Sequence, residues 1–474
     1  MKILKFISEN ILFLLILLLL AVIPLYPKIP VLDVAHTWVY IRIEDFLVLF
    51  AGIVFFVQLV RKKATLKTPL TIPIIVFWVV GAVATIYGVI FIFPKLVAAF
   101  PSVAALHFLR RVEYLSLFFV AFSAMRSRKF VPHIVAVLAI TLIIVVIYGV
   151  GQRYLGFPAF LTMNEEFAKG VPLKLSALSR ISSTFAGHYD LAAYLVMLIA
   201  ILSSMIFGFK NLLVKVFLFL CAVSGLVLLL MTASRVSFAV YLVTITFLLV
   251  LHKKKLLILP VVVLSLLVMS LFTGISERFG STISQVDVVV DARTGKAIGI
   301  AKEDKTGKVV IEEKESTGED LPKGTGYINL PSKSTSAGKN VEYHRSKITD
   351  GSESTEITNL EGDFVVKKVL AYDVSFTTRF QGTWPRAFEA FTRNFLLGSG
   401  YSSISLASDN NYLRILGEVG ALGFISYLGI FLVYFIAVRR ILPDVTDKTS
   451  RAYILGVVAA LFGIGLNAVL IDVF

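Results

Sequence analysis

Residues 11–23 read ILFLLILLLLAVI, a run with no charged or hydrogen-bonding side chain. Lys2 and Lys5 precede it, as in a signal peptide, but the next residues are Pro-Leu-Tyr-Pro (24–27). They lack the small-x-small pattern of a cleavage site, so this run is predicted to be a retained transmembrane helix.

The remainder of the chain has the same character. Of its 474 residues, 57% are hydrophobic and only 16% are charged, and the mean hydropathy is +0.84. A water-soluble chain cannot hide that much apolar surface, so the sequence predicts an all-α polytopic membrane protein. Eleven apolar stretches have roughly spanning length: 8–26, 43–60, 70–93, 101–125, 131–150, 190–208, 211–231, 236–251, 256–274, 411–438 and 452–471.

The formal charge of +15 belongs to the apolar part of the chain. Residues 276–394 carry 17 Lys and Arg against 18 Asp and Glu, and the other residues carry 29 against 13. Short cytoplasmic loops between membrane helices produce such an excess, so the charge requires no nucleic-acid partner. The single cysteine, Cys221, excludes a disulfide framework or a cysteine-based metal site within one chain.

Every second loop is basic, and this sets the orientation. The positive-inside rule puts the N-terminus and these loops in the cytoplasm. The outward side then receives residues 151–189, the turn at Ser234 and Arg235, and residues 276–408. The basic loops contain Arg61, Lys62, Lys63, Lys67, Arg126, Arg128, Lys129, Lys210, Lys215, Lys253, Lys254, Lys255, Arg439 and Arg440.

The predicted organisation has three parts. Nine transmembrane helices lie in residues 1–275, an extracytoplasmic loop in 276–408, and two further helices in 409–474. Eleven crossings from a cytoplasmic start would end the chain outside at the last residue of a helix. We therefore expect a twelfth helix in the natural protein.

Two segments differ within the extracytoplasmic loop. Residues 283–373 alternate Val- and Ile-rich runs with Thr-Gly and Lys-Gly turns, which predicts a β-rich insertion. Residues 376–397 carry aromatic residues at helical spacing, which predicts an amphipathic helix on the outer membrane face, although packing on a core explains the aromatics equally well. These aromatics are Trp384, Phe388, Phe391 and Phe395.

Charges inside apolar segments are costly and are usually functional or paired. The stretch 101–125 contains His107, Arg110, Arg111 and Glu113. Arg110 and Glu113 are three residues apart and are predicted to form a structural ion pair. The alternative is an anion site, in which the guanidinium groups bind phosphate through paired N–H donors.

Further arginines are predicted on the outward side. Singly, each is explained as an anchor whose side chain reaches the lipid headgroups. Together they would suit a lipid pyrophosphate, whose charge must be neutralised and whose departure must be assisted. They are Arg180, Arg235, Arg379, Arg386 and Arg393.

Few residues are candidate general bases. His188 and Asp190 stand at the start of one outward helix, and Asp409 and Asn410 at the start of another. Capping of the helix start is an equally good explanation for Asp190 and for Asp409. Deeper in the same late helix, Glu418 needs a partner, and Arg414 one turn earlier is the expected one.

Several chemical motifs are missing from the sequence. It has no Walker A motif, no GxGxxG after a strand, no HExxH and no DxD in a cytoplasmic loop. This argues against nucleotide-driven transport and against nucleotide-sugar transfer by a soluble domain. We expect neither a cofactor nor a metal.

Four stretches resemble the O-antigen ligase and O-antigen polymerase superfamily, the Wzy/WaaL-like membrane glycosyltransferases. They are RISSTFAGHYDLAAY (180–194), MTASRVSF (231–238), residues 379–384 followed by LGSG (397–400), and DNNYLRILGEVGALG (409–423). Together with the many helices and the large loop before the last ones, the resemblance covers about residues 100–474.

The resemblance implies a reaction on the outer face of the cytoplasmic membrane, in cell-surface polysaccharide biosynthesis. A glycan is transferred from polyprenyl (undecaprenyl) pyrophosphate to a sugar hydroxyl of a second lipid-linked glycan or of another acceptor. Family members are thought to be inverting and to need no metal. Their pyrophosphate-binding arginines map onto Arg235 and Arg379, with Arg180 and Arg386 as second-rank candidates here.

At one position the sequence departs from this family. The ligases carry a His-Asn pair at the start of the late helix, and this chain has Asp409 and Asn410 there. A carboxylate accepts a hydroxyl proton if it is held unprotonated near the acceptor, so Asp409 is the predicted base and His188 the alternative. The substitution favours a polymerase or a ligase-like relative over a strict ligase. The absent twelfth helix is a second departure. The β-rich insertion is a third, and it either recognises acceptor glycan or shields the cleft.

Two other functions compete with this one. A lipid-linked glycan transporter or flippase would use the same arginines to escort the headgroup, but it should carry polar residues in both halves of the bundle. Apart from Glu418, the buried charges lie in the outward half of the bundle. This distribution supports the enzyme. An ion channel would need a ring of charges or a filter-like repeat, and the sequence has neither.

Overall fold

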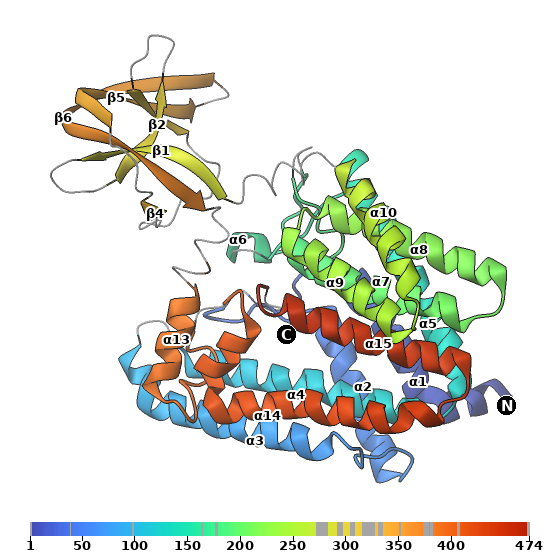
Figure 1. Ribbon diagram of the computed structural model, residues 1–474. Helices are drawn as coiled ribbons and strands as arrows, with labels where there is room; N and C mark the ends of the chain where they lie inside the picture. The colour runs from blue at the N-terminus through green and yellow to red at the C-terminus, as the bar shows by residue number, and fades with distance from the viewer. Residues whose placement is uncertain are drawn as a thin grey trace. The chain divides into compact units, whose positions relative to one another are not determined.

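The protein has two units in a computed structural model (Figure 1): Met1–Ser276 with Arg386–Phe474, and Glu277–Pro385. The structure describes residues 2–37, 39–96, 99–162, 165–175, 179–271, 283–291, 297–303, 309–314, 328–329, 335–349, 352–372, 379, 383–404 and 408–471.

The first unit is helical, and each of the apolar stretches in the sequence overlaps one of its helices. The helices are α1 (Lys2–Leu25), α2 (Ile43–Val60), α3 (Thr71–Tyr87), α4 (Pro101–Ala124), α5 (Val131–Tyr154), α6 (Glu165–Ala168), α7 (His188–Gly208), α8 (Leu212–Met231), α9 (Arg235–Leu251), α10 (Ile258–Ser270), α13 (Trp384–Arg393), α14 (Asn411–Ile441) and α15 (Lys448–Asn467).

Among the described residues, seven helical segments are long and apolar enough to cross a membrane. They include α2, α3, α5, α7, α8, α14 and α15, while Glu9–Leu25, Arg235–Leu251 and Lys255–Ser270 are shorter apolar helices. The charges of Arg110, Arg111 and Glu113 set α4 apart from the seven. The helices fit a multi-pass membrane protein, but seven segments meet the length and composition expected of a span, where the sequence predicted eleven.

The centre of the first unit is α7, which packs against α8, α9 and α15. Small residues allow this close approach. A Cβ on Gly456 of α15 would lie 2.8 Å from the Ser204 Cβ of α7, and a Cβ on Gly463 would lie 2.6 Å from the Thr244 Oγ1 of α9. A second apolar cluster joins α3, α4 and α14 through Ile74, Phe77, Phe119, Ile415 and Tyr427.

The end of the unit where α7 and α9 finish, which we call the basic end, contains a contact between a half-buried histidine and a buried serine. Ser204 Oγ donates to the Ala452 carbonyl (2.6 Å) and lies 2.7 Å from His252 Nε2. Because the hydroxyl proton is used by Ala452, His252 must donate to Ser204 from Nε2. Burial, together with the charges of Arg451 and Lys254, lowers the pKa of His252 from 6.5 to about 4.

The lowered pKa of His252 predicts a loss of stability in mild acid. The unfolded chain binds a proton at His252 near pH 6.5, and the folded chain only near pH 4. The stabilisation is therefore complete above about pH 6.5 and is lost as the pH falls toward 4. We expect a lower thermal midpoint in detergent at pH 5 than at pH 7.5. His252→Gln, whose amide still donates to Ser204, should reduce this difference, and His133→Gln at an exposed histidine should not. An equal difference in both variants would contradict the assignment.

Near its start, α14 is broken at Gly420, which has φ 70° and ψ −170°. Residues 395–400 fill the break: Ser399 and Gly400 N–H donate to the Gly417 and Glu418 carbonyls at 2.8 Å. Two further N–H groups, of Ala421 and Leu422, donate to carbonyls of the same segment at 2.8 and 3.2 Å. Every one of these freed backbone groups is therefore satisfied inside the protein, as a membrane interior requires.

The same segment explains a change in α3. The helix continues past Tyr87 as a wider π-helical turn, Gly88–Ile92, and a short 3₁₀ turn, Phe93–Lys95. A Cβ on Gly88 would clash with the Ser399 carbonyl. The bare Cα of Gly88 thus lets residues 395–400 pack between α3 and α14, which lie side by side in Figure 1.

The predicted amphipathic helix is shorter than residues 376–397. It is described as α13, Trp384–Arg393, and the remainder of 376–382 apart from Arg379 lies outside the described residues. It ends before Asn394 because that side chain accepts hydrogen bonds from the N–H groups of Leu396 and Leu397, both at 3.1 Å.

The second unit contains six strands, all within residues 283–373: β1 (Ile283–Asp291), β2 (Ala297–Glu303), β3 (Val309–Lys314), β4 (Ile328–Asn329), β5 (Thr335–Thr349) and β6 (Ser352–Tyr372). The sheet order is β1-β2-β3-β5-β6-β4, and β1 also pairs with β6. The long β6 makes this possible, because its first part pairs with β5 and its last part with β1. The pairings of the five long strands therefore close into a ring, in which β1 bonds to both β2 and β6.

Candidate functional site

Several chain segments that contain the predicted site residues meet at one end of the helical unit, which we call the convergent end. The Ile181 N–H donates to the Met231 carbonyl at 3.4 Å, which joins the segment before α7 to the end of α8. Thr184 Oγ1 donates to the carbonyl of Pro24, in the last turn of α1, at 2.5 Å.

The late helices close the same end. Ser237 Oγ in the first turn of α9 donates to Asn467 Oδ1 at the end of α15, at 3.1 Å. The Asn411 N–H at the start of α14 donates to the Ala468 carbonyl at 2.9 Å. Residues 180–188, the turn 231–235 and the start of α14 are thus connected through hydrogen-bonded neighbours.

Each of these three segments contains a non-glycine residue in the left-handed region. They are Ser183 (φ 51°), Ala233 (φ 53°) and Asp409 (φ 52°). A left-handed non-glycine residue costs about 1–3 kcal/mol and persists only where the surrounding structure fixes it. Such residues collect at functional sites, so these turns are stronger candidates than the helix interiors.

Arg180 and His188 are in direct contact at this end. Arg180 Nη1 donates to His188 Nε2 at 2.9 Å, and the His188 side chain is buried. Arginine has no acceptor, so Nε2 must be the acceptor and His188 is neutral with its proton on Nδ1. In this geometry Nε2 cannot take a proton from a substrate, which argues against His188 as the base.

Arg235 is the first residue of α9 and is half-buried. The helix begins here because Ser234 Oγ caps it, accepting from the Ser237 N–H at 3.3 Å. A cap at this position fixes the backbone of Arg235 at the convergent end, at the positive end of the helix dipole, where anions are favoured.

Asn410, and not Asp409, caps α14. Its Oδ1 accepts from the Leu413 N–H at 3.0 Å, and its backbone is extended with φ −162°. The sequence allows Asp409 to be either a helix cap or a catalytic base. Its left-handed backbone is incompatible with an N-cap. Asp190 is likewise no cap, because it lies inside the first turn of α7 and is exposed, and Gly187 occupies the cap.

The expected ion pair of α4 has a different partner. Arg110 Nη2 lies 3.6 Å from Asp45 Oδ2 of α2, and among the described residues it is not paired with Glu113. The reason is that α2 begins beside this turn of α4 with an acidic residue. Arg111 faces elsewhere, and its charge acts with those of Arg414 and Glu418 on the buried Tyr401 hydroxyl.

The predicted pair of Glu418 with Arg414 is confirmed. Arg414 Nε lies 3.4 Å from Glu418 Oε2, and both side chains are buried. The Ser402 N–H donates to the other carboxylate oxygen at 3.0 Å. The pair therefore holds the segment after Gly400 against α14 and is structural.

The three arginines of the predicted extracytoplasmic loop have different surroundings. Arg379 belongs to the second unit, and its side chain is buried. Arg386 is exposed on α13, and Arg393 pairs with Glu389 of the same helix at 2.9 Å.

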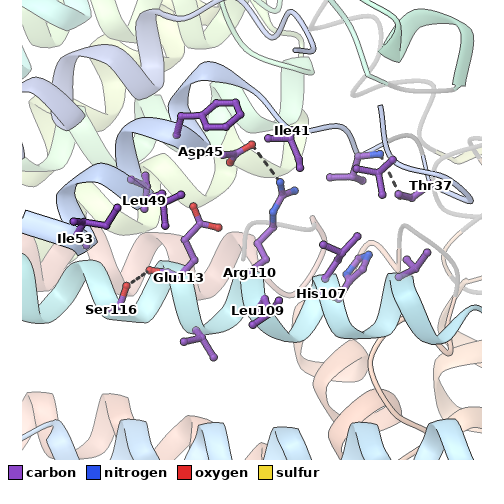
Figure 2. Close-up of a pocket in the computed structure, with 18 of the residues that line it drawn as sticks. Thr37, Ile41, Asp45, Leu49, Ile53, His107, Leu109, Arg110, Glu113 and Ser116 are labelled. Atoms are coloured by element: carbon purple, nitrogen blue, oxygen red, sulfur yellow. Dashed lines mark hydrogen bonds and ion pairs between the residues drawn. The ribbon is translucent and has the colours of Figure 1, made fainter. Parts of the chain in front are cut away.

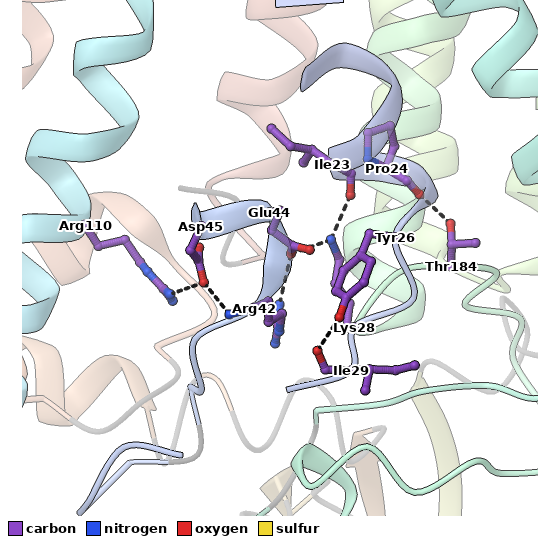
Figure 3. A network of polar contacts seen from close by, with 10 residues as sticks. All are labelled: Ile23, Pro24, Tyr26, Lys28, Ile29, Arg42, Glu44, Asp45, Arg110 and Thr184. Atoms are coloured by element: carbon purple, nitrogen blue, oxygen red, sulfur yellow. Dashed lines mark hydrogen bonds and ion pairs between the residues drawn. The ribbon is translucent and has the colours of Figure 1, made fainter. Parts of the chain in front are cut away.

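The sequence reasoning missed a polar network at the convergent end (Figure 3). Lys28 Nζ donates to Glu44 Oε1 and to the Ile23 carbonyl, both at 2.8 Å, and Lys28 and Glu44 are each 8% exposed. Burial lowers the pKa of the Lys28 ammonium, and the Glu44 carboxylate counteracts part of that shift. Acidic residues at 44 and 45, at the start of an otherwise apolar stretch, were the signal that could have revealed this network.

Two findings bear on the chemistry of the site. Among the described residues, no group of three or more His, Cys, Asp or Glu could hold a metal ion. Comparison with protein-family models and with curated proteins gave no match for this chain.

Proposed function

We propose that this protein is a membrane glycosyltransferase that transfers or polymerises a polyprenyl-pyrophosphate-linked glycan at the convergent end. The observation that supports this most is the joining of residues 180–188, the turn 231–235 and the start of α14 at one end, each with a left-handed non-glycine residue. These are the segments in which the sequence resembles O-antigen ligases and polymerases. A rigid end that combines arginines with a carboxylate suits group transfer from a pyrophosphate.

In this proposal α1, α4, α9 and α10 cross the bilayer together with the seven longest apolar segments. The convergent end faces outward and the N-terminus lies in the cytoplasm. The basic residues near the opposite ends of the helices support this orientation. The strands of the second unit then belong to an extracytoplasmic loop.

The reaction requires one displacement. A sugar hydroxyl of the acceptor attacks the anomeric carbon of the donor glycan, and the bond from that carbon to the pyrophosphate oxygen breaks. The electron pair leaves with the lipid pyrophosphate, whose growing charge Arg235 stabilises, with Arg180 as a second-rank partner. Roles for Arg379 and Arg386 are proposed from the family resemblance alone. The hydroxyl proton passes to Asp409, and inversion follows from the single displacement.

The contact of Arg180 with His188 assigns them different roles. Because His188 Nε2 accepts from Arg180 Nη1 at 2.9 Å, the imidazole fixes one edge of the guanidinium. The other N–H groups of Arg180 can then point at a phosphate oxygen. His188 is therefore proposed as a positioning residue.

A transfer assay tests the proposal. The full chain in liposomes is given synthetic polyprenyl-pyrophosphate glycan, and release of lipid pyrophosphate is measured together with the product glycan. We expect Arg235→Ala and Asp409→Asn each to lower the transfer rate by about a hundredfold, since each removes a group that acts on the developing charge or on the proton. Arg439→Ala, at an exposed arginine of the basic end, is the matched control and should keep wild-type activity.

Unchanged transfer in Arg235→Ala would exclude this arginine from the site. If Asp409→Asn alone remained active, no side chain proposed here would be the base.

A lipid-linked glycan transporter is the second candidate, and the break of α14 favours it. Discontinuous membrane helices often form the substrate sites of transporters. Here, however, residues 395–400 occupy the broken backbone, which leaves little for a substrate to bind. Protein-dependent movement of intact lipid-linked glycan across the liposome, without release of pyrophosphate, would establish the transporter in place of the enzyme.

A further inference from the structure

A cavity of about 690 Å³ lies between α2 and α4 (Figure 2). Aliphatic and aromatic side chains of both helices form most of its wall, and residues of the loop before α2, including Thr37 and Ile41, line one end. Its volume lies in the range of pockets that bind small organic molecules, about 300–1,000 Å³.

The apolar part of the wall opens sideways to the membrane. Leu49 and Ile53 of α2 are 60% and 54% exposed, and Leu109 of α4 is 57% exposed. In a membrane protein, apolar side chains with this exposure face lipid. A hydrocarbon chain can therefore enter from the bilayer without crossing water.

Charged groups interrupt this apolar wall. In Figure 2, Arg110 and Glu113 point from α4 toward α2, where Arg110 meets Asp45 at 3.6 Å. Ser116 Oγ donates to the Glu113 backbone carbonyl at 2.6 Å. Among the described residues, the Glu113 carboxylate makes no hydrogen bond or ion pair. A carboxylate in this position is costly unless a ligand supplies its partner.

The charges of the cavity disfavour an anionic headgroup. Its two carboxylates, Asp45 and Glu113, outnumber its one guanidinium, Arg110, which already pairs with Asp45. An uncharged head with several hydroxyls matches both, because hydroxyls donate to the carboxylates and accept from the guanidinium. Six polar side chains, among them Thr37, His107 and Ser116, are spread along the wall, which favours a sugar with many hydroxyls over a smaller alcohol.

We propose that this cavity binds a neutral glycolipid from the bilayer. Glu113 and Arg110 bind the hydroxyls of its uncharged sugar head, and its hydrocarbon chain lies against Leu49, Ile53 and Leu109. The inference does not rest on the proposed glycosyl transfer, because Arg180, Arg235 and Asp409 do not line the cavity. It assigns Arg110 to this site and not to the pyrophosphate.

Photocrosslinking tests the proposal. The full chain is purified in a sugar-free detergent, since alkyl glycosides would compete, and is placed in phosphatidylcholine nanodiscs. The probe is an alkyl β-glucoside with a diazirine in its chain. Probes with the same chain and a phosphate or a phosphocholine head serve as controls. We expect the glucoside to label peptides of α2 and α4 at least about fivefold more than either control, and unlabelled alkyl glucoside to abolish this labelling.

Two variants localise the binding. Gly52 of α2 lines the cavity, and a Cβ there would have no atom within 4 Å, so Gly52→Phe should place its ring in the cavity and reduce the labelling about tenfold. Gly429→Phe is the matched control, because Gly429 of α14 is equally open and lies outside the cavity. Glu113→Gln keeps the shape and should weaken labelling by a few fold, since it replaces a charged acceptor with a neutral one.

Equal labelling by the three probes, or labelling that unlabelled glucoside does not displace, would overturn the proposal. Undiminished labelling in a folded Gly52→Phe protein would do the same. If that variant does not fold, competition in the wild-type protein and the Glu113→Gln result decide. Stronger labelling by the phosphate probe would assign the cavity to an anionic lipid instead.

Discussion

Gly420→Ala is expected to destabilise the folded protein by about 3 kcal/mol or to prevent its folding. The backbone of Gly420, with φ 70° and ψ −170°, lies in a region that only glycine adopts readily. A Cβ there would also clash with the Leu396 carbonyl, which must stay close because residues 395–400 bind the broken ends of α14. The measurement is the yield of monodisperse protein and its thermal midpoint in detergent.

Gly429→Ala is the matched control on the same helix. Nothing lies within 4 Å of the position of its Cβ, so it should be neutral or slightly stabilising. Gly398 lies on the segment that packs against the break, with φ 68°, and a Cβ there would be 2.6 Å from the Gly420 nitrogen. Gly398→Ala should therefore destabilise the protein about as much as Gly420→Ala. A Gly420→Ala protein as stable as Gly429→Ala would mean that α14 continues unbroken.

Lys28→Met is expected to reduce the free energy of unfolding by about 3 kcal/mol or more, because it leaves a buried carboxylate without its main partner. Glu44 is 8% exposed, and its Oε2 already makes no hydrogen bond among the described residues. The remaining cation, Arg42, is 3.6 Å from Glu44 Oε1 and compensates only in part. Thermal unfolding in detergent measures the effect.

Two further variants separate charge from packing. The double variant Lys28→Met with Glu44→Leu removes both charges and should recover most of the stability. Arg393→Met breaks the more exposed pair with Glu389 and should change stability by about 0.5 kcal/mol or less. If Lys28→Met reduced the free energy of unfolding no more than Arg393→Met, the network in Figure 3 would not stabilise the fold.

The difference between these pairs shows how far local reasoning reaches. Arg414 and Glu418 lie one turn apart on a helix, so their contact was predictable from spacing. Arg110 and Glu113 have a similar spacing, yet Arg110 meets Asp45 of another helix. Spacing brings two side chains to the same face, but a non-local charge can still be the better partner.

The same limit applies to the candidate site. The sequence identified Arg180, His188, Arg235, Asp409 and Asn410, but their roles depended on contacts. The contact of Arg180 with His188 argues against the histidine as a base, and the cap on α14 falls to Asn410 and leaves Asp409 in a strained turn. Proximity in three dimensions decided both.

The sequence by itself determined the class of protein and the positions of the helices, because hydropathy over about 20 residues is a local property that the bilayer reads directly. It also identified the charged residues of α4 and of the starts of α7, α9 and α14 as candidate site residues, because charges within apolar segments are energetically unfavourable in a membrane. Only the tertiary structure decided that α14 is broken, that Lys28 pairs with Glu44, and that a cavity separates α2 from α4. These features depend on which distant segments pack together, and neither hydropathy nor helical spacing encodes that choice.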